Sequence, residues 1–309
     1  MQEHCSILSW QGGFLCYNND MRLIRFLLSI ILALVLIASA GAALSSFAVT
    51  EAVSEEAIHK AVVETGAVDE LTDRILAQNT VNMGGQYGQT MKEILKSEAM
   101  TEFFTAYTAG CLQNQVRGEE GTAGSGYYNE IGSDDLFVAF SGGTDECINN
   151  GSISMREGER KIFDAALKAA MPTLANGINY VIQQMNLTSF IDDDTAEYME
   201  TAQMMTSSEF RYGAIGIAAI ACLGLILLRR HRRSGMFWCG ICLLLIAGLF
   251  FVFATMLSGS AESSGNFVAL STRMLYVMVA YGLKKVATVG GAVGIACLPV
   301  CLVAKLLRR

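Results

Sequence analysis

Leu228-Arg-Arg-His-Arg-Arg-Ser-Gly235 (LRRHRRSG) separates two long uncharged apolar runs, residues 213–228 and 236–257. Each run has about 16–22 residues, close to the ~20 that an α-helix needs to cross a hydrocarbon core of about 30 Å. A connection this short and this basic is typical of a cytoplasmic turn, because lysine and arginine gather on the cytoplasmic side of membrane helices. The stretch therefore predicts a hairpin of two transmembrane helices with a turn at 229–235 inside the cell.

Two further apolar runs lie at residues 21–49 and 286–304, and basic residues flank both. The flanking basic residues of all four runs fall on one side of a membrane only if the chain crosses it four times. These topology determinants are Arg22, Arg25, Arg229, Arg230, Arg232, Arg233, Lys305, Arg308 and Arg309. We therefore predict a mainly α, multi-pass protein of the cell membrane with four transmembrane helices and with both termini, including the tail 305–309, in the cytoplasm.

The segment 258–285 admits two interpretations. Residues 267–283 are apolar enough for a fifth span, but Lys284-Lys285 would then be the whole connection to the next span, and the last basic cluster would lie outside. Phe267, Leu270, Met274 and Tyr281 recur at helical spacing. We predict an outer loop followed by an amphipathic helix.

The start of the chain has two open questions. Residues 1–20 show neither helical periodicity nor a helix cap, so we interpret them as an extension ahead of a true start at Met21. The run that follows contains Ala38-Ser39-Ala40, which also fits a signal-peptidase site. Because the apolar run continues to residue 49, we expect a retained signal anchor; a cleaved signal is the alternative.

Residues 50–212 form the long segment between the first two spans, and they are acidic. The segment has 26 acidic and 10 basic residues, a net charge of −16, whereas the whole chain carries −7. Such a charge disfavours nucleic acid and anionic lipid surfaces as partners and permits cations or basic peptides. The same acidity is also explained by the solubility of an exposed domain.

Periodic apolar residues predict that this extracytoplasmic domain is helical, with Ser54 as an N-cap and Pro172 at the start of a helix. We expect helices over 69–76, 90–112 and 156–170, and one that begins at Asp192 and runs on into the second span. The glycine-rich stretch 117–157 is predicted to be loops, with 136–140 as a strand or a plug into the core. Because loops on a rigid scaffold often carry binding, this stretch is the expected contact region.

Cysteines fall into two groups. Cys111 and Cys147 are the two within the extracytoplasmic segment, and a disulfide between them would close a loop worth on the order of 3–4 kcal/mol. Two free thiols are the alternative. Cys239-Gly-Ile-Cys242 has C-x-x-C spacing, but it lies in an apolar helix, where cysteine usually packs as a small side chain.

Carboxylate clusters are the weak candidates for a metal site. Asp192, Asp193, Asp194 and Glu197 resemble the oxygen ligands of a hard cation, but the EF-hand spacing is absent and the N-terminal turn of a helix explains them equally well. No zinc spacing, phosphate-binding loop or nucleophile elbow occurs. We expect no catalytic residue, no resident metal and no cofactor.

Three functions remain after these exclusions. The first is a non-enzymatic membrane protein whose acidic extracytoplasmic domain binds a partner or ligand. The second is an accessory subunit of a membrane transport or export complex, docked through small-residue helix faces such as Gly290–Gly294. The third is a membrane-bound hydrolase that uses carboxylates. The partners expected are the lipid bilayer and a protein, and not nucleic acid.

Overall fold

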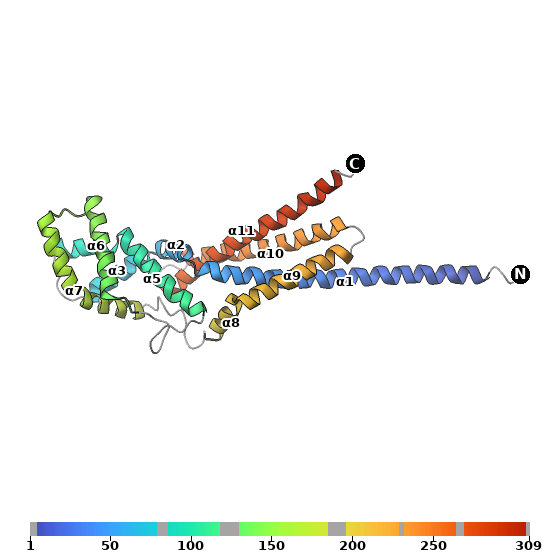
Figure 1. Cartoon of the computed structure of the whole chain (residues 1–309), viewed down its shortest axis with the longest axis horizontal. Coiled ribbons are helices and arrows are strands. Elements are labelled where there is room, and N and C mark those ends of the chain that lie inside the picture. The colour runs from blue at the N-terminus through green and yellow to red at the C-terminus, as the bar shows by residue number, and fades with distance from the viewer. Residues whose placement is uncertain are drawn as a thin grey trace. The chain divides into compact units, whose positions relative to one another are not determined.

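Helices account for all regular structure in the part of the chain that the computed structural model describes, residues 5–78, 86–117, 130–184, 196–228, 232–263 and 269–306. Those residues hold eleven α-helices and no strand (Figure 1). The helices are α1 (Cys5–Ala52), α2 (Glu55–Thr65), α3 (Ala67–Gln78), α4 (Gln86–Leu95), α5 (Glu98–Arg117), α6 (Ser133–Asn149), α7 (Glu157–Gln184), α8 (Ala196–Thr206), α9 (Ser208–Leu228), α10 (Arg232–Ser263) and α11 (Leu270–Leu306). The prediction of a mainly helical chain is confirmed for these residues.

Three described segments are long and apolar enough to cross a membrane: Leu23–Ala52, Ser208–Leu228 and Gly235–Glu262. They lie in α1, α9 and α10 and overlap the first three predicted spans. These helices give the chain the features of a multi-pass membrane protein. The fourth predicted span, 286–304, lies in α11, and its side chains beyond residue 298 fall outside the described residues.

The chain divides into two compact units. The first, here the membrane unit, comprises Met1–Phe47, Ser208–Val252 and Lys284–Arg309. Its helices touch through small residues: a Cβ added to Gly240 of α10 would lie 3.1 Å from the carbonyl oxygen of Gly294 in α11. A Cβ added to Gly290 would meet Leu44 of α1 at 3.4 Å. The glycines of Gly290–Gly294 therefore allow close packing within this unit.

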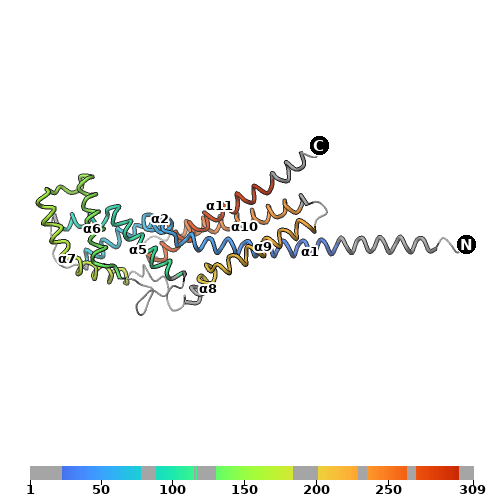
Figure 2. Tube along the Cα trace, in the orientation of Figure 1, coloured from blue at the N-terminus to red at the C-terminus, as the bar shows by residue number. Residues whose placement is uncertain are grey.

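The second unit, here the acidic unit, comprises Ala48–Ser207 and Phe253–Leu283. The chain can be followed through α2–α8 of this unit in Figure 2. Its core gathers apolar side chains from these helices together with Leu270, Met274 and Met278 at the start of α11. The apolar stripe expected over 267–283 thus supplies core residues to the acidic unit.

Two predicted helix boundaries are wrong in the acidic unit, and side-chain chemistry explains the first. The helix expected over 90–112 is broken at Ser97, whose hydroxyl oxygen accepts a hydrogen bond from the N–H of Met100 at 3.3 Å. Ser97 therefore starts α5 as an N-cap. The second boundary is Pro172, which lies inside α7 and does not start a helix. A proline in a helix removes one backbone hydrogen bond, a cost that neighbouring packing can offset.

The glycine-rich stretch also differs from its prediction. Its described part contains the 17-residue helix α6, which buries Leu136 and Phe140 in the core. Gly143 lies on the packed face, where an added Cβ would overlap the Ser97 hydroxyl oxygen and lie 3.2 Å from the Ile94 carbonyl oxygen. Glycine here permits close contact between helices, and does not mark a loop.

The chain also departs from expectation at its start and before α9. Residues 5–20 belong to α1, although their sequence has no apolar periodicity. The helix expected to run from Asp192 into the second span ends at Thr206, and Ser207 separates α8 from α9. The Ser207 hydroxyl donates to the carbonyl oxygen of Met204 at 2.7 Å, a local bond that competes with helix continuation.

Candidate functional site

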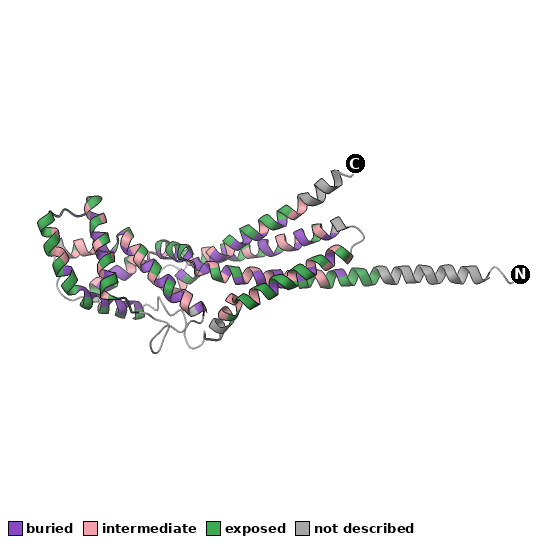
Figure 3. Ribbon diagram, in the orientation of Figure 1, coloured by how far each residue is buried: buried purple, intermediate pink, exposed green. Residues whose placement is uncertain are grey.

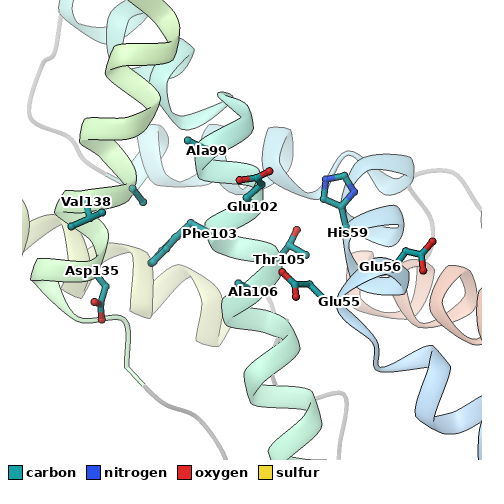
Figure 4. Close-up of a pocket in the computed structure, with 11 residues that line it drawn as sticks. Glu55, Glu56, His59, Ala99, Glu102, Phe103, Thr105, Ala106, Asp135 and Val138 are labelled. Atoms are coloured by element: carbon teal, nitrogen blue, oxygen red, sulfur yellow. The ribbon is translucent and has the colours of Figure 1, made fainter.

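An open groove of about 800 Å³ lies between α2, α5 and α6 on the acidic unit (Figure 4). Four carboxylates, one histidine and several apolar side chains surround it. The residues that line it are Glu55, Glu56, His59, Ala99, Glu102, Phe103, Thr105, Ala106, Asp135, Val138 and Ala139. We call this feature the acidic groove.

The first wall of the groove comes from the N-terminal turns of α2. Ser54 begins this helix, because its hydroxyl oxygen accepts a hydrogen bond from the N–H of Ala57 at 3.3 Å. Glu55 and Glu56 follow in the first turn, where the helix dipole favours negative charge. Burial of Ala57 and Ile58 leaves Glu55 and His59, four residues apart, exposed on the groove side.

The other two walls come from α5 and α6 and combine charge with apolar surface. Glu102 and Ala106 are exposed on α5, with Phe103 half-buried between them. On α6, Asp135 and Val138 are exposed, and Val138 is 70% accessible. Since these side chains recur at spacings of three and four residues, each helix presents one face to the groove. The groove therefore combines carboxylates and apolar side chains from three helices.

Three of the four carboxylates that line the groove lie outside the salt bridges of the acidic unit. Among the described residues, no salt bridge is formed by Glu55, Glu102 or Asp135. Salt bridges elsewhere on the acidic unit involve Glu64, Asp69, Glu70, Asp73, Asp145, Glu157 and Asp164. An external cation would therefore meet Glu55, Glu102 and Asp135 without having to displace a salt bridge.

Thr105 adds a buried polar atom at the groove. Its side chain is only 1% exposed, and its hydroxyl oxygen has no hydrogen-bond partner in the described part of the chain. Figure 4 shows Thr105 between Glu102 and the residues of α2. A buried hydroxyl without a partner is costly, so a polar group that reached it would gain a hydrogen bond.

The disulfide predicted between Cys111 and Cys147 is absent. Both cysteines are free thiols, Cys111 in α5 and Cys147 in α6, and both are buried. Cys147 packs in the apolar core, and this burial raises the pKa of its thiol, with a smaller contribution from the charge of Glu146. Cysteine behaves here as a small apolar side chain, a role that the number and spacing of cysteines in the sequence do not reveal.

The predicted carboxylate candidates are mostly outside the described residues. Asp192, Asp193 and Asp194 lie there, and Glu197 belongs to α8 without a described side chain. In the part of the chain that is described, no group of three or more histidine, cysteine, aspartate or glutamate side chains could hold a metal ion. Of the nine topology determinants, Arg25 alone has a described side chain, and it is exposed.

Sequence reasoning missed the acidic groove as a site. The only local indication of the groove is the spacing of Glu55 and His59, which places both on one face of a helix. No comparable signal joins that face to Glu102 and Asp135, because helix packing alone brings α5 and α6 beside it. Comparison of the chain with protein-family models, with curated proteins and with solved structures finds no match.

Proposed function

We propose that this chain is a non-enzymatic multi-pass membrane protein whose acidic unit captures a basic protein segment outside the cytoplasm. The observation that carries the proposal is that Glu55, Glu102 and Asp135, which form no salt bridge among the described residues, line one groove together with apolar side chains. A simple cation needs clustered oxygen ligands, whereas these carboxylates come from three helices and surround apolar side chains. That mixture suits a cationic chain with apolar anchors.

The size and openness of the groove support a peptide-like occupant. Its volume of about 800 Å³ matches the range of sites that hold a drug-sized ligand or a few residues of a peptide. Phe103 and Val138 offer contact to an apolar side chain, and Glu55, Glu102 and Asp135 offer charge to lysine or arginine. One wall is α6, from the glycine-rich stretch expected to carry binding.

Placement of the groove outside the cytoplasm rests on the proposed topology of four spans. The basic flanks of the apolar runs favour cytoplasmic termini and a cytoplasmic turn at 229–235. Retention of α1 as a signal anchor is supported by packing: Leu36, Ser39 and Ala40, at and before the possible cleavage site, are buried. The mass of the purified chain tests this point, since loss of residues 1–40 would contradict retention.

Neutralising the groove is the direct test of the proposal. In the full-length protein reconstituted in nanodiscs, we expect the triple variant E55Q/E102Q/D135N to weaken binding of a fluorescent basic amphipathic peptide. Three exposed charge contacts together are worth about 1–3 kcal/mol, so the expected loss of affinity is roughly 10-fold at low salt. Added salt should weaken wild-type binding toward the level of the variant.

A matched control separates the groove from overall acidity. The variant E98Q/E130Q/D134N removes the same number of charges from exposed carboxylates that do not line the groove. It should bind the peptide nearly as wild type does. Equal loss of affinity in both triple variants would mean that the acidic unit attracts cations without a specific site.

A second candidate function, an accessory subunit of a membrane complex, is favoured by one face of α9. Gly213 and Gly216 are exposed, and a Cβ added to either would meet nothing within 4 Å. Ile217 and Ile220 are exposed beside them, and Figure 3 shows how much of α9 is accessible. Small residues on an open helix face permit close docking of another membrane helix.

Replacement of that face tests the second candidate. The variant G213L/G216L should release any membrane protein that co-purifies with the wild type in mild detergent. The variant G248L, at another glycine with open space around it, is the control and should retain the partner. Retention of the partner by both variants would remove the argument for docking through α9.

A further inference from the structure

Two cysteines of the membrane unit face each other across adjacent helices. The sulfur atom of Cys222 in α9 lies 3.1 Å from that of Cys239 in α10, close enough for a thiol hydrogen bond. Both belong to an apolar cluster with Leu36, Ala221 and Leu225, and Cys239 is only 2% exposed. The two thiols are therefore held together by the packing of three helices.

Close approach of the two helices explains this contact. Gly235, at the start of α10, is pressed against α9: an added Cβ would lie 2.5 Å from the Cα of Ile226 and 2.8 Å from the carbonyl oxygen of Leu225. Ala221, which is almost fully buried, precedes Cys222 on α9. Small residues at these points permit close packing of the two helices.

We propose that Cys222 and Cys239 form a reversible disulfide that locks α9 to α10. Two S–H bonds break and one S–S bond forms, and the two electrons and two protons pass to a lipid-soluble quinone, which becomes the hydroquinone. A quinone is the fitting class of oxidant because the thiols lie in apolar surroundings within two predicted membrane spans. The inference rests on the membrane placement of α9 and α10 and is independent of the acidic groove.

The proposed pair differs from the C-x-x-C pair visible in the sequence. Cys242 follows Cys239 on α10 and is also buried, but the sulfur atom of Cys239 contacts that of Cys222. Cys297 of α11 lies nearby, since a Cβ added to Gly240 would be 3.2 Å from its Cβ. Cys242 and Cys297 therefore provide neighbouring thiols as internal controls.

The experiment uses the full-length protein in native membranes. Membranes are treated with a fully substituted benzoquinone, which accepts electrons without adding to thiols, and are then quenched in acid. Free thiols are alkylated with N-ethylmaleimide in SDS before peptide mass spectrometry. For wild type we expect a cross-linked peptide pair that contains residues 222 and 239, in more than half of the chains, with two fewer alkylated thiols per chain.

Cysteine-to-alanine variants identify which two cysteines form the disulfide. In C222A we expect residue 239 to remain alkylated and the cross-link to disappear, whereas C242A and C297A should form it as wild type does. Persistence of all thiols in oxidised wild type, or a cross-link between residues 239 and 242, would overturn the proposal. So would a metal ion that co-purifies with wild type and is lost in C242A, since the thiols would then be metal ligands.

Discussion

Glu146 illustrates how one side chain can define the start of a helix far away in sequence. Its carboxylate lies at the N-terminus of α5 and accepts hydrogen bonds from the N–H groups of Glu98 and Ala99, each at 3.1 Å. Helix N-termini leave such donors unsatisfied, and a negative charge there is favoured by the helix dipole. The contact joins α6 to the break at Ser97 and so helps to orient two walls of the acidic groove.

Replacement of Glu146 should loosen α5. We expect E146A to lower the stability of the acidic unit by about 1–2 kcal/mol, because two N–H groups lose their acceptor. That loss corresponds to roughly 5- to 30-fold faster alkylation of buried Cys111 under native conditions, measured by mass spectrometry. The control E157A breaks an ion pair with Lys161 in which both side chains are more than three-quarters exposed, and should leave the rate unchanged. Equal rates in all three proteins would remove the capping role.

At the scale of the element, local sequence signals predicted helices well where they act within one helix. Ser54 is the N-cap of α2 as its sequence predicts, and the stripe through Leu270 and Met274 is helical. Local sequence signals gave wrong predictions where packing against another helix determines the structure. Glycine at position 143 favours a loop when the local sequence is considered alone, but Gly143 contacts the junction of α4 and α5 from within α6.

The two adjacent glycines of α6 allow a matched test of this packing. In G143A the new methyl group would overlap the Ser97 hydroxyl, so we expect a loss of stability of about 1–3 kcal/mol. In G142A the new methyl group meets Ala99 at 3.6 Å, an ordinary contact, and replacing glycine in a helix should be neutral or stabilising by up to ~1 kcal/mol. Denaturant unfolding that ranks the two variants equally would contradict this account of α6.

At the scale of the whole molecule, the uneven distribution of charge along the chain is the main basis for predicting the membrane spans and the acidic segment. Residues 50–212 carry a net charge of −16 within a chain of −7, and the basic residues cluster at the ends of apolar runs. Membrane insertion depends on the hydropathy and charge of whole segments, so membrane spans can be predicted from the sequence. The groove depends on Glu55, Glu102 and Asp135 lining one site from three different helices. The net charge of a segment does not predict which helices pack side by side.

Labelling of single added cysteines in intact cells or spheroplasts tests the central claim, that the acidic unit lies outside and the arginine-rich turn inside. Position 157, on the acidic unit, and position 234, within the predicted turn 229–235, are changed separately in Glu157→Cys and Ser234→Cys. A membrane-impermeant maleimide is applied, and the modified residue is identified by peptide mass. We expect modification at position 157 in intact cells and at position 234 only after permeabilisation. Modification at position 234 in intact cells, or protection of position 157 until the membrane is opened, would contradict the central claim.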